Sequence, residues 1–402
     1  MDPRSPGRLP DGAYAAALAS LIPIGPGRLR SLLADGDPGR MWAEVSSGHR
    51  LDGDGSWRAA AATIDPAALW DRHRRAGVGV LLRHRPGYPT ALADDPGAPA
   101  VLFCRGEPSV LGDRPRAALV GTRSATRYGL GVAAQLGTEL AAAGVCVVSG
   151  LALGIDGAAH EGALAGRRAA GPEGGAPVGV VVGPLDRPHP RQHAHLWERV
   201  ADAGLLLSEA PLDLGTLPRW RFPQRNRVLA ALSDVVVVVE SHATGASLAT
   251  AQAAKRRGVS VGAVPGSIRS PASAGTNDLL ADGCFVVRDA ADVLVAVDLA
   301  RPGPVAGRRS DAAGRSGPAP RRGEAGRIAS ATPPAATVGD GRPPPELGPL
   351  DRRVLGALEW EPRPLEDVLT ATGGGLGEVA AALERLAALG LVGGESGWWV
   401  RR

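Results

Sequence analysis

Between residues 116 and 290 the chain alternates short apolar runs with stretches whose apolar residues recur at helical spacing. Residues 235–239 are all valine, a run typical of a strand buried on both faces of a parallel sheet. The apolar runs predict strands at 117–121, 145–150, 178–183, 205–209, 235–240, 259–265 and 284–288. The intervening stretches predict helices at 129–143, 156–165, 191–203, 224–232, 247–257 and 276–281. This alternation predicts a doubly wound α/β domain with a mostly parallel sheet.

The preceding residues predict a small helical domain. Apolar positions at 15–21 and 29–33 indicate two helices, with Ile24-Gly25-Pro26-Gly27-Arg28 between them. That turn is typical of helix-hairpin-helix or SAM-like modules, in which glycines let backbone N–H groups approach a phosphate. A Gly/Pro turn between two packed helices explains the same residues without a ligand, so both interpretations stay open.

Apolar periodicity returns near the C-terminus. Residues 350–358, 365–369 and 379–389 predict three helices, and 390–400 predicts a β-hairpin. This order is typical of a winged helix, which binds either duplex DNA or protein. The region before it is rich in Arg, Pro and Gly, as in flexible linkers. We therefore expect a helical domain at 1–78, an α/β core at 79–299, a linker at 300–347 and a winged helix at 348–402.

Charge and cysteine content narrow the class of protein. The chain has 45 Lys+Arg, 41 Asp+Glu and a net charge of +4, and its pI is about 9.4. Lys255 is the single lysine, so almost every cation is a guanidinium suited to phosphate. Cys104, Cys146 and Cys284 have no disulfide-framework or zinc spacing, and no apolar stretch predicts a signal peptide or membrane span. We expect a soluble cytoplasmic protein with no metal and no cofactor.

Two predicted strands end in loops suited to an anion. Gly121, Arg123 and Ser124 lie between a strand and a helix, where backbone N–H groups and the helix dipole favour negative charge. Ser149 and Gly150 end the next strand with small side chains that allow a ligand to approach closely. Neither loop has the GxGxxG spacing of a dinucleotide site.

Catalysis at the second loop is not expected. Ser149, Asp156 and His160 supply the residue types of a hydrolytic triad, but no GxSxG elbow accompanies them. Capping and packing explain Asp156 and His160 more simply. We therefore assign no catalytic residue.

The densest cationic segment lies at 219–227. Arginines at 219, 221, 225 and 227 alternate there with Trp220, Phe222 and Asn226. Aromatic rings that stack bases beside guanidiniums that hold phosphates are typical of single-strand binding. Ion pairs with Asp213 or Asp234 are the alternative. Near the later strand ends, Ser247, Gly266 and Asn277 add small polar groups to the same crevice.

The ordered motifs resemble the DprA/Smf family of DNA-processing proteins. They are Val120-Gly121-Thr122-Arg123, Ser149-Gly150-Leu151-Ala152, Gly154-Ile155-Asp156, Arg221-Phe222-Pro223-Gln224-Arg225-Asn226-Arg227 and Val264-Pro265-Gly266. The resemblance covers about residues 80–298. It implies a Rossmann-like core that binds single-stranded DNA, forms a homodimer and loads RecA onto strands during natural transformation or recombination, with single-strand-binding protein as a further partner.

The resemblance also implies which residues contact DNA. The phosphate pocket would comprise Gly121, Arg123, Ser124, Ser149 and Gly150. The arginine motif would add Arg221, Phe222, Arg225, Asn226 and Arg227, with Ser247, Gly266 and Asn277 at the rim.

Two other functions are consistent with parts of the pattern. A nucleotide-binding enzyme that cleaves N-glycosidic bonds would use Glu240 as its acid/base. Such enzymes resemble one another in a Pro-Gly-Gly-x-Gly-Thr run, which this chain lacks, so we expect a binding protein rather than an enzyme. A transcription-linked regulator would act through residues 348–402.

Overall fold

A computed structural model describes residues 8–34, 36–49, 55–212, 214–215, 221–301, 347–358, 363–395 and 398–401. The chain divides into two compact units, Met1–Pro302 and Gly303–Arg402. Most of the expected linker lies outside the described residues. So do Arg219 and Trp220 of the predicted binding segment, and Asp213, one of the two carboxylates considered as ion-pair partners for its arginines.

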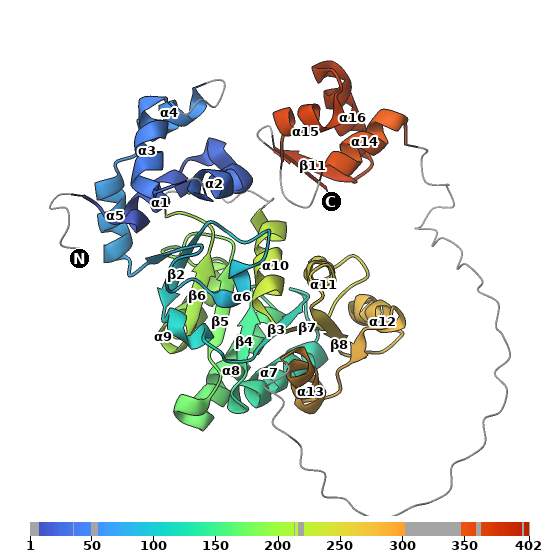
Figure 1. Ribbon diagram of the computed structural model, residues 1–402. Coiled ribbons are helices and arrows are strands. Elements are labelled where there is room, and N and C mark those ends of the chain that lie inside the picture. The colour runs from blue at the N-terminus through green and yellow to red at the C-terminus, as the bar shows by residue number, and fades with distance from the viewer. Residues whose placement is uncertain are drawn as a thin grey trace, which may run out of the picture. The chain divides into compact units, whose positions relative to one another are not determined.

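One nine-stranded sheet organises the first unit (Figure 1). Its order is β1-β2-β6-β5-β4-β3-β7-β8-β9. Strands β3 to β9 are all parallel, whereas β2 is antiparallel to β1 and β6. The bounds are β1 (Gly79–Leu82), β2 (Val101–Gly106), β3 (Arg116–Gly121), β4 (Cys146–Ser149), β5 (Pro177–Val181), β6 (Leu205–Ser208), β7 (Val235–Glu240), β8 (Ser260–Ala263) and β9 (Phe285–Val286). The predicted α/β class with a mostly parallel sheet is confirmed.

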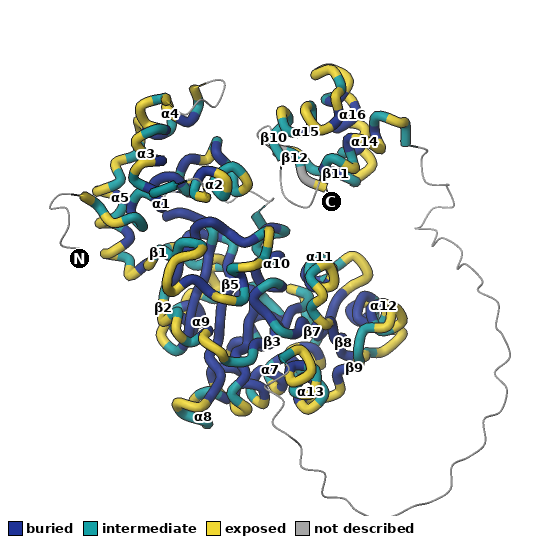
Figure 2. The backbone as a smooth tube through the Cα atoms, viewed as in Figure 1, coloured by how far each residue is buried: buried dark blue, intermediate teal, exposed yellow. Residues whose placement is uncertain are grey.

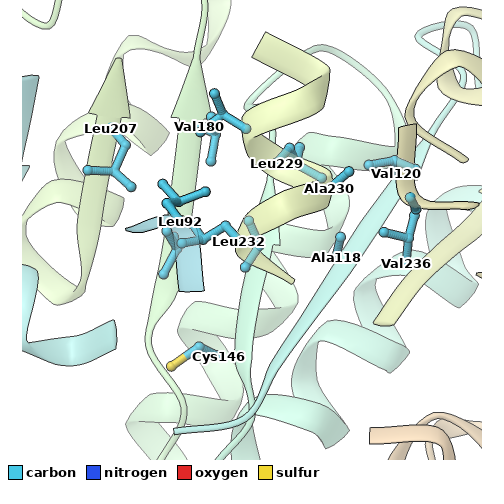
Figure 3. Packing of buried hydrophobic residues seen from close by; sticks show 14 of the residues in the cluster. Leu92, Ala118, Val120, Cys146, Val180, Leu207, Leu229, Ala230, Leu232 and Val236 are labelled. Atoms are coloured by element: carbon cyan, nitrogen blue, oxygen red, sulfur yellow. The ribbon is translucent and has the colours of Figure 1, made fainter. Parts of the chain in front are cut away.

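Helices cover both faces of this sheet. On one face, α10 (Arg221–Leu232), α11 (Ala246–Lys255) and α12 (Ala274–Ala281) pack on β3 and β7. Figure 3 shows Leu229 and Ala230 of α10 beside Ala118 and Val120 of β3. On the other face lie α7 (Arg127–Ala142), α8 (Ile155–Ala170), α9 (Ala194–Ala203) and α13 (Ala290–Ala300). The central strands are consequently buried throughout, as Figure 2 shows.

Helices α7 and α8 approach each other closely because glycines line their contact. A Cβ atom on Gly162 would lie 2.0 Å from Ala134 O, and one on Gly137 would lie 2.3 Å from Ala159 O. Both distances are far below van der Waals contact, so only glycine fits. This close packing fixes the N-terminal ends of both helices relative to the strand ends from which they start.

The N-terminal helices join the core rather than standing apart. They are α1 (Asp11–Ala19), α2 (Gly25–Ala34), α3 (Pro38–Ser47), α4 (Ser56–Ala61) and α5 (Pro66–Arg75). A short 3-10 turn, Ile22–Ile24, separates α1 from α2, and Gly25 has φ 66°, a conformation that favours glycine. Ala15, Ala16 and Leu69 share a buried cluster with Phe103 of β2 and Trp197 of α9. One continuous apolar core therefore links the helical segment to the sheet.

The second unit is small and mixed. It contains α14 (Pro349–Ala357), α15 (Leu365–Thr372) and α16 (Leu376–Ala388). It also contains a three-stranded antiparallel sheet of order β10-β12-β11. Strand β10 (Arg363–Pro364) lies between α14 and α15, whereas β11 (Val392–Glu395) and β12 (Trp398–Arg401) follow α16. Val354, Val368 and Leu383 form its core. Three helices and a hairpin are in the predicted order, and the winged-helix function stays a prediction.

Two further features of the described chain bear on its chemistry. Helix α11 ends at the exposed Lys255, shortly before β8 begins, so the single lysine lies at the edge of the sheet where the parallel strands start. Within the described residues, every helix is too short or too polar to cross a bilayer.

Candidate nucleic-acid interface

The candidate site lies where strands β3 to β9 end, which we call the carboxyl edge. From β3 the chain proceeds to β4, β5 and β6 in one direction, and then returns to β7 on the other side of β3. In open α/β sheets this reversal opens a crevice between the two diverging connections, and ligands bind there. Gly121 of β3 and Glu240 of β7 end side by side at this point.

Glu240 is committed to holding the start of α7. It is 2% exposed, its Oε2 accepts a hydrogen bond from Thr126 N at 2.7 Å, and its Oε1 accepts one from Thr126 Oγ1 at 2.6 Å. A Cβ on Gly129 would come within 2.5 Å of Oε2, so glycine leaves room for the carboxylate. Both carboxylate oxygens of Glu240 are therefore engaged in holding the first turn of α7.

Arg123 presents an open cation at the carboxyl edge. Both Arg123 and its neighbour Ser124 are exposed. The guanidinium carbon of Arg123 lies over the ring of Phe222, 5.3 Å from its centroid. His189 meets the same ring edge-on at 6.5 Å, with the planes inclined by 68°. Because residues 121–124 and 221–222 are a hundred positions apart in sequence, only the fold brings this cation and ring together.

Arg225 is buried, in contrast to its predicted role on the surface. Its side chain is 11% exposed, its Nη1 donates to Val180 O at 3.1 Å, and it lies 3.9 Å from Asp156 Oδ2. Asp156 Oδ2 also accepts a hydrogen bond from Gly150 N at 3.1 Å. Burial lowers the pKa of the Arg225 guanidinium and raises the pKa of the Asp156 carboxyl, and each group opposes the shift of the other.

This buried pair supports the turn that follows β4. A Cβ on Gly150 would lie 1.4 Å from Arg225 Nη1, so glycine at this position makes room for the guanidinium, and its predicted contact with phosphate stays a prediction. The next residue, Leu151, has φ 54° and is fully buried, a strained conformation for a leucine. His193 Nδ1 lies 3.0 Å from Leu151 O and helps to fix it. Arg225 and Asp156 therefore hold a strained turn at the carboxyl edge.

Other predicted contacts are also engaged inside the protein. Ser149 is fully buried and donates to Leu119 O at 2.6 Å. Arg227 is 7% exposed, and its Nη2 donates to Oε1 and Oε2 of Glu209 at 2.9 and 2.8 Å. Ser247 is 7% exposed and donates to Ser241 Oγ at 2.9 Å. These three side chains stabilise the edge from within, and we leave them out of the contact surface.

The remaining predicted residues occupy intermediate positions. Arg221 Nη1 donates to Glu209 O at 3.5 Å, and Asn226 is half-buried in the first turns of α10. Gly266 and Asn277 bind each other, since Gly266 N donates to Asn277 Oδ1 and Asn277 Nδ2 donates to Gly266 O, both at 3.2 Å. That pair fixes the loop after β8 at the rim of the crevice.

Sequence reasoning missed two aromatic groups at this edge. Tyr128 is 52% exposed and its hydroxyl donates to Pro265 O at 2.9 Å, which ties the start of α7 to the loop after β8. His189 stacks edge-on against Phe222. The Arg127-Tyr128 pair directly after the first loop was the available signal for Tyr128, whereas nothing local to His189 indicates its partner.

Burial of His160 makes stability depend on pH. It is fully buried in α8, and desolvation lowers its pKa to about 3, below the ordinary value of 6.5. The unfolded chain therefore takes up a proton between pH 6.5 and 3 that the folded chain refuses, so stability falls as pH falls through that window. We expect His160→Gln to flatten the decline by up to about 1.4 kcal/mol per pH unit. Denaturant midpoints from pH 7 to 4 measure this, and identical slopes in both proteins would contradict it.

Comparison with known proteins agrees with this architecture. Residues 79–298 match the family model of DNA recombination-mediator protein A. The chain is 35% identical over 222 residues to the DNA processing protein DprA of Bacillus subtilis, covering 55% of this chain and 72% of that one. It is 43% identical over 199 residues to the putative DNA processing protein DprA of Mycobacterium tuberculosis, a match that spans about half of each chain.

A solved structure shows the same arrangement. DNA processing protein A of Streptococcus pneumoniae superposes with a TM-score of 0.55 and 28% identity, covering 71% of this chain and 94% of that chain. The family match extends over more than half of the present sequence and includes all nine strands of the large sheet. The resemblance inferred from the motifs is confirmed: the chain belongs to the DNA recombination-mediator protein A family, the DprA/Smf proteins.

Proposed function

We propose that this recombination mediator binds single-stranded DNA at the carboxyl edge, through Arg123 and Phe222. The exposed guanidinium of Arg123 over the Phe222 ring is the observation that carries the proposal. A guanidinium holds a phosphate while a ring stacks on a base, and this pairing accepts any base because each has a π-face. Ser124 and Arg221 extend the same surface, while Arg225 and Asp156 hold it from below.

The proposed task is to load RecA onto the bound strand without covalent catalysis. A protein that presents a strand to RecA needs a cationic groove and no reactive group. The engagement of Glu240 in capping α7 supports this division. We propose in addition that two copies associate as a homodimer, because two grooves on one strand raise its effective concentration at each. Such a protein would work in the cytoplasm, beside RecA and single-strand-binding protein.

Filament assembly provides the test of this function. We expect the full chain to bind oligothymidylate with an affinity that falls as salt rises. For each phosphate contact, the logarithm of the affinity should fall by about 0.7 per tenfold rise in salt concentration. We further expect it to accelerate RecA assembly on strands coated with single-strand-binding protein. Binding without acceleration would contradict the loading role, and a salt-independent affinity would contradict the electrostatic site.

A further inference from the structure

A second basic hollow lies in the same unit, beside the N-terminal helices. It is a surface pocket of about 90 Å³ between the α2–α3 connection and the end of β1. Its charged and imidazole lining residues are Arg30, Arg83, His84 and Arg85. Three arginines and a histidine thus converge on one small cavity, and no aromatic ring other than that of His84 lines it.

Sheet register places this hollow at the carboxyl edge. Leu82 at the end of β1 pairs with Val101 at the start of β2. Phe103 of β2 pairs with Ser208, the last residue of β6. Because β2 is antiparallel to both neighbours, the residues after Leu82 leave the sheet on the side where β6 and the other parallel strands end. The hollow and the Arg123–Phe222 surface therefore open at the same edge.

The charge of the hollow favours an anion. All hydrogen bonds of Arg83 within the described chain go to main-chain oxygens, those of Ala93 at 2.8 and 3.1 Å and of Asp95 at 3.0 Å. No described carboxylate therefore neutralises this half-buried guanidinium directly. Asp37 binds Arg8 outside the hollow. Asp11 lies 3.5 Å from Arg85, so one carboxylate stands against the three arginines that line the hollow. Asp35 lies outside the described residues.

Further arginines line the route between the two sites. Arg187, after β5, is 49% exposed and donates to Leu212 O and Leu214 O beyond β6. Arg72 of α5 is 42% exposed, donates to Leu212 O at 3.0 Å and pairs with Asp186 at 2.9 Å. Their main-chain contacts hold both cations over the loops that follow β5 and β6. Arg187 Nε also lies 3.6 Å from Asp186 Oδ1, so the two arginines share one carboxylate and keep one positive charge in excess between the two sites.

The separation suits a short stretch of single strand. Arg123 follows β3, and in the sheet order β3 and β1 are five steps apart, or about 24 Å at about 4.8 Å per step. A stacked strand rises about 3.4 Å per nucleotide along its axis, so about seven nucleotides bridge the distance. A ligand that reaches both sites must be longer than this.

We propose that the hollow is a second phosphate site for the same DNA strand, so that the N-terminal helical segment extends the binding track. The inference rests on the proposed function and deepens it. Guanidiniums without a stacking ring select the phosphodiester rather than the base, so this site adds affinity and length dependence without sequence preference. It also gives the helical segment a role in holding DNA through Arg30 of α2, together with Arg85 after β1, rather than through its glycine turn.

Oligonucleotide length separates this site from the first. We compare the full chain with the Arg30→Gln/Arg85→Gln variant on oligothymidylates of about five and about fifteen nucleotides. On the longer strand we expect roughly tenfold weaker binding and a salt slope reduced by about 1.4, from two lost phosphate contacts. On the shorter strand we expect no change, because it occupies only the Arg123 surface.

A matched control excludes a general charge effect. Arg168 is exposed near the C-terminal end of α8, at the opposite edge of the sheet, and Arg168→Gln should bind both strands normally. Equal losses on both lengths, or no loss on the longer strand, would overturn the second site while leaving the first intact. Failure of the unmodified protein to bind either length would overturn the proposed function and this extension with it. Thermal midpoints within about 2 °C for all variants would show that folding is unchanged, as surface sites allow.

Discussion

Replacing Arg123 with alanine should weaken binding of single-stranded DNA by tenfold or more. A hydrogen bond to a charged group contributes about 1.5 to 3 kcal/mol, and each factor of ten in affinity corresponds to about 1.4 kcal/mol. The slope of the logarithm of the affinity against the logarithm of the salt concentration should become shallower by about 0.7, since one phosphate contact is lost. Because Arg123 is exposed, the free energy of unfolding should not change. Fluorescence anisotropy over a range of salt concentrations measures both effects.

A double-mutant cycle tests whether Arg123 and Phe222 act together. The two groups are in cation–π geometry at 5.3 Å, so the losses of Arg123→Ala and Phe222→Ala should not add, with a coupling of about 0.5 to 2 kcal/mol. Arg168→Ala removes the same charge at the other edge of the sheet and should bind DNA normally. Additive losses, or an equal loss in Arg168→Ala, would refute the assignment of this surface.

Replacing Arg225 with alanine should destabilise the protein by about 3 to 5 kcal/mol, the usual cost of leaving a buried charge without its partner. Asp156, whose side chain is 7% exposed, would then have no guanidinium beside it. Chemical denaturation measures the loss. The deficit should shrink as pH falls toward the ordinary aspartate pKa of 3.8, because burial raises the pKa of Asp156 in the folded protein and protonation removes the uncompensated charge.

A second substitution distinguishes support from direct contact. Adding Asp156→Asn to Arg225→Ala removes the unpaired charge and keeps the hydrogen bond from Gly150 N, so part of the stability should return. If Arg225 instead contacted DNA from the surface, Arg225→Ala would weaken binding while the unfolding midpoint stayed unchanged. That result would restore Arg225 to the contact surface.

The sequence predicted the core of the fold well because strand and helix periodicities are local. The all-valine run gave β7 at 235–240, and the predicted helix at 276–281 lies inside α12 (Ala274–Ala281). The strands β1 and β2 were missed, since they lie among prolines, glycines and charged residues without clean alternation. Helix α13 (Ala290–Ala300) was missed as well, because its mostly apolar sequence has no polar face to give it helical periodicity.

The sequence predicted near which strand ends the candidate residues lie, but not which way their side chains face. Sequence places arginines at 221, 225 and 227 near a strand end, yet it cannot show which face of α10 packs on the sheet. The partners of Arg225 and Arg227 are Asp156 and Glu209, which are distant in sequence, so only tertiary structure reveals that both arginines turn inward. Arg123 makes no ion pair with a carboxylate of the described residues, and it is exposed, as a DNA contact requires.

The position of Lys255 has a practical and a biological consequence. Amine-directed reagents and lysine acetyltransferases do not attack guanidinium groups, so in the folded chain they would modify Lys255 and the terminal amino group alone. Lys255 is at the edge of the sheet opposite the arginines that we propose to contact DNA. A fluorophore can therefore be attached there without blocking the strand, and lysine acetylation in a cell would leave the charge of the DNA-binding surface intact.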